Sequence, residues 1–325
     1  MKFIPFFLIL LVPFSRTEES TGLFFEDTEK VYGIKTDPIP IMDAEVQVIP
    51  FKRAGRLIII EAEVDSLKGN FIFDTGAPYL VLNKTYFRNY RKRRERKASG
   101  ITGNSTTANS LRINQLNIRK INYSNIEADV VNLGEIENAR GIKILGLLGL
   151  NLFKSFEIEV DINQSVIRLY KIDEFGQCLK PPSTDFKCEI TQPITVYDNT
   201  IFTQCTIAGK SLRFGFDTGA ETNALNSRVS KKILETISLT GRRRLSGVGD
   251  GNVEILIGRL NDFKMGESTI FGMQTLITNM DGMDAAYGTT VDGMLGFDFL
   301  AKGIVRINCR KKYLKLCLFD KFSSE

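Results

Sequence analysis

Two short stretches of the chain carry residues whose types and spacing could do chemistry. They read FIFDTGAPYLVLN at residues 71–83 and FGFDTGAETNALN at residues 214–226. In each, an apolar, strand-like run ends in an aspartate, Asp74 or Asp217, and burying such an acid is costly unless it is hydrogen-bonded or functional. If the two carboxyl groups meet, they cannot both ionise easily, so they share a proton. Such a pair can hold a water molecule, accept its proton as a base and protonate a carbonyl oxygen as an acid.

The composition of the chain excludes several other chemistries. The 325 residues include no histidine, which rules out Ser-His and Cys-His catalysis within the chain and every histidine-based zinc site. The net charge of +5 is too small to indicate nucleic acid as a partner. We therefore expect a reaction that uses carboxyl groups alone, with no metal, no cofactor and no nucleic acid.

The two aspartate stretches belong to a longer internal repeat. GLLGLNLF at residues 146–153 matches GMLGFDFL at residues 293–300, and SGITGN at residues 99–104 matches SGVGDG at residues 246–251. Equivalent residues of the two copies are separated by 143 positions at the aspartates (74 and 217). The separation is 147 positions at the SG segments (99 and 246) and beyond them. One short insertion accounts for this difference, so the chain is a tandem duplication.

The elements that must position the aspartates are mostly strands. Residues 56–65 and 200–209 are short runs of β-branched and aromatic residues, and residues 157–162 and 166–171 bracket Asn163-Gln164 as a hairpin. A helix is expected at residues 227–237, from apolar residues spaced four apart, and a surface loop at residues 281–293.

We predict a mostly β fold of two similar β-barrel-like lobes, related by a pseudo-twofold axis and containing few helices. The predicted divisions are a signal peptide at residues 1–20, an N-terminal extension at 21–41, lobe 1 at 42–173, a linker at 174–187 and lobe 2 at 188–321. The extension could equally be a short pro-segment.

The N-terminus has the pattern of an export signal. Lys2 precedes 12 apolar residues, Phe3 to Phe14, whereas a helix needs roughly 20 to span a bilayer. We expect cleavage somewhere after Pro13, at a site that the sequence does not define, and a periplasmic or extracellular protein with no stable membrane span. An uncleaved anchor or a buried segment is the alternative.

All five cysteines lie in the second half of the chain. An exported chain permits disulfides, and an odd count leaves at least one thiol unpaired within the chain. Cys178 and Cys188 flank the Pro-containing linker and could pair; plain buried thiols are the alternative.

The sequence DTGA, followed some 70–80 residues later by two hydrophobic residues and a glycine, resembles the retropepsin and pepsin group of aspartic peptidases. DTGA, in place of the DTG-Ser of most pepsins, is closer to the retropepsins. Two copies on one chain resemble the tandem retropepsin-like peptidases of bacteria. The resemblance implies an acid-protease-like fold, a monomer, and a polypeptide substrate bound in extended conformation.

The resemblance also implies roles for residues at matching positions. Asp74 and Asp217 would be the catalytic pair. Thr75 and Thr218 would interlock beneath it, and Gly76 and Gly219 would donate backbone N–H groups to the carboxylates. Residues 147–149 and 294–296 would pack under the two turns. The flap that closes over the substrate would contain Gly100, Ile101, Gly103, Gly247, Val248 and Gly249.

The chain departs from the family pattern beside the dyad. Pro78 follows the first DTGA, whereas Glu221 follows the second, so the two copies are not equivalent there and Pro78 could impair activity. Ala77 and Ala220 replace the hydroxyl that pepsins place near the dyad. Because a donor to the ionised form is lost, the apparent pKa should rise, and we expect an activity optimum that is only mildly acidic.

Residues 88–97 hold seven basic residues in ten, and residues 241–247 are also basic. A solvated basic surface is the simplest interpretation; an acidic partner, a membrane surface and a proteolytic cut site are the alternatives.

The sequence thus predicts an exported aspartic endopeptidase that acts through Asp74 and Asp217. A catalytically weak or inactive protein that only binds extended peptides is the main alternative. A structural β module, in which DTG is merely a turn, is the third.

Overall fold

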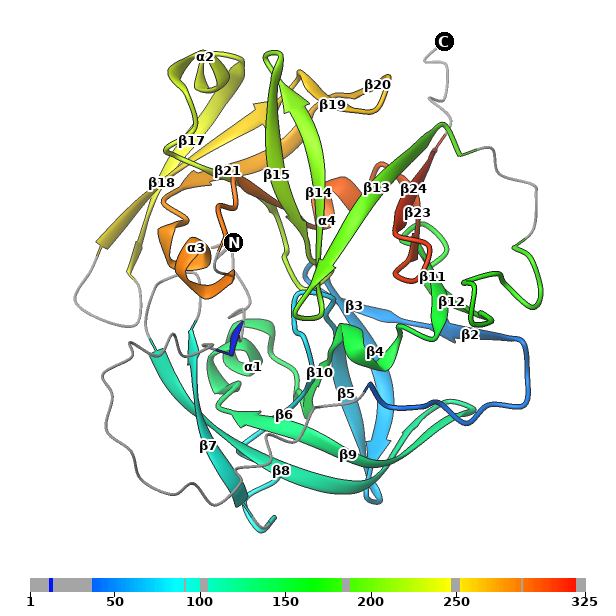
Figure 1. The fold of residues 1–325 in the computed structure, drawn as a ribbon. Coiled ribbons are helices and arrows are strands. Elements are labelled where there is room, and N and C mark those ends of the chain that lie inside the picture. Colours follow the sequence, from blue (N-terminus) through cyan, green and yellow to red (C-terminus); the bar gives the residue numbers. More distant parts are fainter. Residues whose placement is uncertain are drawn as a thin grey trace, which may run out of the picture.

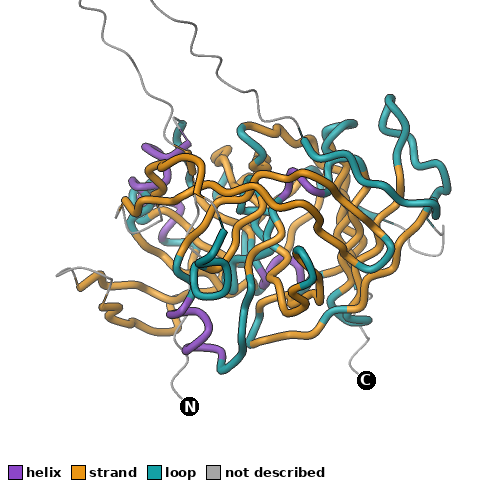
Figure 2. The backbone as a smooth tube through the Cα atoms, turned by 90° about the horizontal axis from the view of Figure 1, so that it is seen from below, coloured by secondary structure: helices purple, strands orange, loops and turns teal. Residues whose placement is uncertain are grey.

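The computed structural model describes residues 12–13, 37–90, 92–99, 105–182, 188–246, 252–287 and 289–319. Within them the chain is mostly β and forms two similar lobes, with the strands β4 to β10 in one and β14 to β22 in the other (Figure 1). The same predominance of strand over helix is evident along the backbone tube (Figure 2). The predicted mostly β fold of two barrel-like lobes is therefore confirmed.

The first lobe is one sheet that curls back on itself. Its strand order is β1-β7-β8-β9-β6-β10-β5-β4-β3, and β8 pairs in addition with β4. This extra pairing joins strands from distant parts of the sheet, as in a barrel. The strands are β1 (Val12–Pro13), β3 (Lys52–Ala54), β4 (Leu57–Val64), β5 (Leu67–Phe73), β6 (Leu80–Asn83), β7 (Lys92–Ser99), β8 (Ser105–Ile118), β9 (Ile121–Val131) and β10 (Gly146–Leu148).

The second lobe repeats this arrangement. Its strands run in the order β17-β18-β21-β16-β22-β15-β14-β13, and β19 pairs with both β14 and β20. The strands are β13 (Ile190–Tyr197), β14 (Thr200–Ile207), β15 (Lys210–Phe216), β16 (Asn223–Asn226), β17 (Ile237–Ser246), β18 (Asn252–Leu260), β19 (Phe263–Met265), β20 (Ser268–Ile270), β21 (Met273–Thr278) and β22 (Gly293–Leu295).

A central sheet joins the lobes. Its order is β13-β24-β23-β11-β12-β2, with β2 (Val46–Pro50), β11 (Phe156–Asp161) and β12 (Val166–Lys171) from the first copy and β23 (Gly303–Asn308) and β24 (Tyr313–Leu318) from the second. The copies meet where β11 pairs antiparallel with β23, and Glu159 lies opposite Arg306 in that register. Because these two residues are 147 apart, each faces its own counterpart, and the pseudo-twofold axis passes between them.

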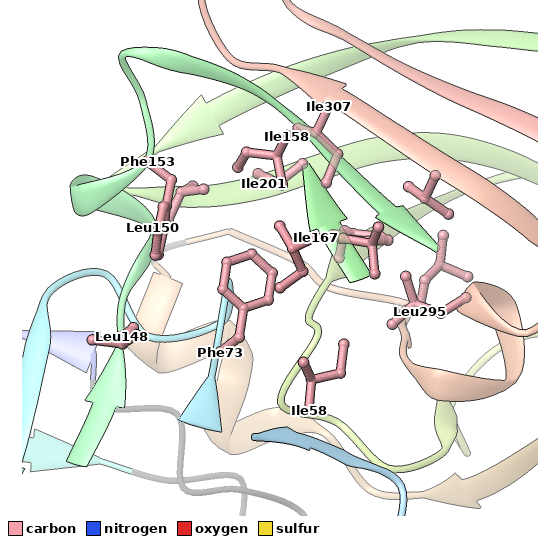
Figure 3. Close-up of a cluster of buried hydrophobic side chains, with 14 of the residues drawn as sticks. Ile58, Phe73, Leu148, Leu150, Phe153, Ile158, Ile167, Ile201, Leu295 and Ile307 are labelled. Atoms are coloured by element: carbon pink, nitrogen blue, oxygen red, sulfur yellow. The ribbon is translucent and has the colours of Figure 1, made fainter. Parts of the chain in front are cut away.

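The hydrophobic core runs without a break from one lobe to the other. One cluster of buried side chains includes Phe73 from the first lobe, Phe216 from the second, and Ile158 and Ile307 from the central sheet. Figure 3 shows Phe73, Ile158, Ile201, Leu295 and Ile307 converging from these different elements. Relative movement of the lobes would disturb this packing, so the core helps to fix where the two aspartate turns lie.

The helices of the described residues are short: α1 (Gly134–Arg140), α2 (Lys231–Leu234), α3 (Asp281–Tyr287), α4 (Phe297–Leu300) and the 3-10 helix η1 (Leu150–Leu152). Two predictions need correction. The helix expected at residues 227–237 is a single turn, because strand β17 already begins at Ile237. The loop expected at residues 281–293 begins as helix α3, which is anchored by the buried side chains of Met283 and Tyr287.

The disulfide also differs from the pairing considered from the sequence. Cys188 is bonded to Cys317, not to Cys178, because β13 and β24 are neighbouring strands and bring the start of the second copy beside its last strand. Cys205 and Cys309 are buried free thiols, as the alternative interpretation expected, and Cys178 is half-buried.

The predicted signal peptide lies almost wholly outside the described residues; within it, β1 pairs with β7. No helix of the described residues is long and apolar enough to cross a membrane. The boundaries of the signal peptide, extension, lobes and linker stay predictions.

Candidate active site

Asp74 and Asp217 each follow the last residue of a buried strand. Strand β5 ends at Phe73 and β15 at Phe216, and both aspartates are only 2% exposed. The N–H of Asp74 donates to the carbonyl of Leu148 (3.1 Å), and that of Asp217 donates to the carbonyl of Leu295 (2.9 Å). The segments at residues 147–149 and 294–296 therefore lie directly against the two turns.

The threonines of the two turns hold the lobes to each other. The N–H of Thr75 donates to the hydroxyl oxygen of Thr218, and the N–H of Thr218 donates to that of Thr75, each at 3.0 Å. The Thr218 hydroxyl then donates to the carbonyl of Phe73 (2.8 Å), and the Thr75 hydroxyl donates to the carbonyl of Phe216 (3.4 Å). All four bonds cross between the copies, so they fix the two turns in one mutual orientation.

The glycines of the turns allow the carboxyl groups to approach. A Cβ atom on Gly76 would lie 2.4 Å from Cγ of Asp217, and one on Gly219 would lie 2.7 Å from Cγ of Asp74. The backbone N–H groups of Gly76 and Ala77 donate to Oδ1 of Asp74 at 2.9 and 3.0 Å, and that of Gly219 donates to Oδ1 of Asp217 at 2.7 Å. Any side chain at either glycine would push the opposite aspartate away.

The two buried carboxyl groups hydrogen-bond each other. Burial raises the pKa of Asp74 well above its ordinary value, and the nearby charge of Asp217 raises it further. Burial also raises the pKa of Asp217, although its hydrogen bonds with Asp74 and with backbone N–H groups oppose this. The pair therefore keeps a proton at pH values where an exposed aspartate has lost its own.

The residues expected to form the flap, Gly100, Ile101, Gly103, Gly247, Val248 and Gly249, lie outside the described residues. They connect the strands of two equivalent antiparallel hairpins, β7 with β8 and β17 with β18. The strands on either side of each flap candidate therefore form a hairpin. The flap assignment itself stays a prediction.

The structure brings charged residues to the second turn that sequence reasoning missed. Both oxygens of Glu221 accept hydrogen bonds from Arg140, at 2.7 Å from Nε and 2.5 Å from Nη2. Arg56 donates to the carbonyl of Glu221 (3.1 Å) and pairs with Asp298 (2.9 Å). Glu221 could have predicted such a partner from the sequence, because an acid buried beside the dyad requires a cation to pair with it.

Among the described residues, no group of three or more cysteine, aspartate and glutamate side chains could hold a metal ion.

Comparison with known proteins agrees with this arrangement. A family model described as "Aspartyl protease" matches residues 60–152 and 203–299, one region in each copy and together more than half of the chain. A search of curated protein sequences finds no match.

Among solved structures, the crystal structure of edgp matches with a TM-score of 0.51 and 9% identity, over 86% of this chain and 96% of that one. Basic 7S globulin from soybean matches with a TM-score of 0.45 and 11% identity, over 84% and 94%. At this identity the edgp match shows a shared fold alone. The resemblance to retropepsin- and pepsin-like peptidases in two copies is confirmed, and the chain belongs to the aspartyl protease family.

Proposed function

We propose that the protein is an exported aspartic endopeptidase that hydrolyses peptide bonds through a water molecule activated by Asp74 and Asp217. The observation that carries this proposal is the meeting of the two buried, hydrogen-bonded carboxyl groups at the ends of equivalent strands. A pair of acids is expensive to bury, and a structural turn would not require it.

The reaction follows from a dyad that carries one proton. The ionised carboxylate takes a proton from the bound water while the water oxygen attacks the carbonyl carbon of the peptide bond. The protonated carboxyl gives its proton to the carbonyl oxygen, so a tetrahedral diol forms. As the diol collapses and the C–N bond breaks, one carboxyl group gives its proton to the nitrogen while the other carboxylate takes a proton from a diol hydroxyl. The amine and the carboxylic acid leave, and the pair is again singly protonated.

The surroundings of the dyad support this chemistry. The backbone N–H groups of Gly76, Ala77 and Gly219 hold the carboxyl oxygens without side-chain movement. The threonine interlock keeps the carboxyl groups together through each cycle. Both features lower the reorganisation that the reaction requires.

Family membership favours a polypeptide as the substrate, bound in extended conformation, and the chain is proposed to act as a monomer. Export to the periplasm or the extracellular space is supported by the apolar N-terminal run and by the Cys188–Cys317 disulfide, which needs an oxidising compartment.

The test is cleavage of a peptide library by the wild type, Asp74→Asn and Asp217→Asn from pH 3 to 8, with and without pepstatin. We expect pepstatin-sensitive cleavage by the wild type and a loss of at least about a thousandfold in each variant. A folded wild type that binds peptides without cutting any of them would support the peptide-binding alternative and reject this proposal.

A further inference from the structure

The pseudo-twofold symmetry of the site is broken in a systematic way. Four pairs of equivalent positions surround the dyad: Arg56 and Asn199, Pro78 and Glu221, Arg140 and Tyr287, and Asn151 and Asp298. The element bounds support these equivalences, since α1 and α3 are displaced by 147 residues at both ends and β4 and β14 by 143. Each pair has one charged and one neutral member.

The four charged members gather on one side of the axis. Arg56 and Arg140 come from the first copy and reach across to Glu221 and Asp298 of the second. The side chains of Arg140 and Glu221 are only 12% and 4% exposed, so the bidentate pair is shielded from water. A Cβ atom on Gly55 would lie 3.3 Å from Nε of Arg140, so the first lobe packs closely against this pair.

On the other side, the counterpart of Arg140 does not cross between the lobes. Tyr287 is buried in its own lobe, edge-on to Phe202 at a centroid distance of 5.1 Å, and it packs in a cluster with Ala220 and Met294. The contacts that cross on that side include hydrogen bonds from Tyr79 to Asp198 (3.4 Å) and from Lys154 to Asn199 (2.9 Å).

The Arg140–Glu221 pair is coupled to the dyad through a short, rigid turn. Glu221 follows Ala220, whose N–H donates to the Asp217 carbonyl (3.3 Å) and whose carbonyl accepts from the N–H of Phe297 (2.9 Å). The same turn carries Gly219, which abuts the carboxyl of Asp74. A shift of Glu221 toward or away from the first lobe must therefore change the spacing of the two carboxyl groups.

We propose that Arg140 is a positioning residue for the dyad: it clamps Glu221 from the opposite lobe and so sets the distance between the carboxyl groups of Asp74 and Asp217. It acts on Asp217 through Glu221 and the turn that holds both residues. This inference rests on the proposed peptidase activity, which the clamp would serve.

The experiment compares Arg140→Met, Glu221→Gln and the double variant with the wild type. We expect kcat to fall about ten- to a hundredfold in each single variant, with KM changed less than about threefold, because the dyad and not the substrate site is displaced. The double variant should be within about twofold of the singles, because all three lack the same contact. Arg140→Lys, which keeps the charge but not the bidentate geometry, should recover part of the loss.

The control is Arg168→Met, which removes another arginine from a buried glutamate, Glu159, but lies on strand β12 of the central sheet and not in the turns of the dyad. It should lower stability and leave kcat within about twofold of the wild type. If Arg140→Met does not fold, Arg140→Lys and Glu221→Gln carry the same comparison.

A second readout is independent of cleavage. Carbon-13 NMR titration of the aspartate carboxyl groups should show two widely separated apparent pKa values for the wild-type dyad and a smaller separation in Arg140→Met. If the wild type cleaves no peptide, the proposed function is rejected. The NMR titration of the wild type and Arg140→Met would still show whether Arg140 sets the spacing of the two carboxyl groups. If Arg140→Met lowers the melting temperature but leaves both kcat and the dyad titration unchanged, Arg140 has only a structural role and the proposal is overturned.

Discussion

Asp74 and Asp217 each depend on a residue from the other copy. The glycine of one turn makes room for the carboxyl of the other, and each threonine accepts a hydrogen bond from the opposite threonine. Neither half-site is complete alone, although the two DTG triplets are identical in sequence. The smallest unit that can be tested is therefore the pair of turns.

Gly76→Ala should abolish most activity. Its new Cβ atom would lie 2.4 Å from Cγ of Asp217, so the carboxyl must move and the dyad loses its geometry. We expect kcat/KM to fall by at least about a hundredfold, with a loss of about 1–3 kcal/mol in the free energy of unfolding. Gly241→Ala is the matched control, because no atom of the described residues lies within 4 Å of the added Cβ there. Normal cleavage by Gly76→Ala would mean that the two carboxyl groups need not be this close.

The raised pKa values predict how stability depends on pH. The ordinary aspartate pKa is 3.8, and burial raises that of Asp74 well above it. The folded state therefore binds a proton that the unfolded state has already released. Stability should be highest below about pH 4 for this group and should fall as pH rises through the folded pKa, with a slope of up to about 1.4 kcal/mol per pH unit. Urea unfolding at several pH values should reveal this slope in the wild type and a flatter profile in Asp74→Asn.

The same shift predicts the activity profile. The shared proton is retained to higher pH than in a solvated pair, so the alkaline limb of kcat/KM should lie toward neutral pH. The optimum should then be mildly acidic, as the replacement of the neighbouring hydroxyl by Ala77 and Ala220 also suggests. An optimum near pH 2 in the rate profile would contradict this expectation.

At the scale of elements, the sequence predicts a strand correctly where its local residue pattern and its tertiary environment favour the same structure. The strands expected at residues 56–65 and 200–209 are β4 and β14, and the hairpin expected around Asn163 is formed by β11 and β12. The first four residues of β4 and of β14 are all buried, in agreement with the β-branched and aromatic residues of these runs. The helix expected at residues 227–237 failed because Ile237 serves as the first residue of β17.

The disulfide is a further property of elements rather than of single residues. It ties Cys188, at the start of the second copy, to Cys317 in β24, across 129 residues of chain. Cys317→Ser should lower the free energy of unfolding by about 2–5 kcal/mol, because a long loop in the unfolded chain is released. Cys178→Ser, which alters a half-buried free thiol, should change stability far less. Equal thermal unfolding of the two variants under oxidising conditions would argue against a stabilising disulfide.

At the scale of the whole molecule, the junction between the copies is symmetric in backbone and asymmetric in charge. Glu159 faces its own counterpart Arg306 across the pseudo-twofold axis, and Arg306 Nε lies 2.6 Å from Glu159 Oε2. Two identical copies would place like charges there, which would repel each other in a buried site. The Glu159–Arg306 pair therefore favours the pairing of the first copy with the second over the pairing of two identical copies.

Arg306→Met should lower the free energy of unfolding by about 3–5 kcal/mol, because it removes one partner of the buried Glu159. Arg306→Met combined with Glu159→Leu should recover most of that loss, because the buried carboxylate is removed together with Arg306. Arg168, which also pairs with Glu159, is more exposed and keeps its hydrogen bond to Gln164. Lys68→Met, which breaks an exposed pair with Glu61, should change stability by less than about 1 kcal/mol. Urea denaturation measures all three; a double variant no more stable than Arg306→Met would show that the ion pair itself holds the halves together.

The sequence by itself determined the duplication, the mostly β lobes, the family and the two aspartates that the structure brings together. These follow from local patterns, since a repeated phrase and an apolar strand that ends in an acid are visible without knowing any contact. Only the tertiary structure decided which residues face one another across the two copies. The interlock of the turns, the Arg140–Glu221 pair, the Glu159–Arg306 pair and the Cys188–Cys317 bond each join residues from distant parts of the chain. Such pairings depend on how the lobes pack, and spacing along a sequence does not specify packing.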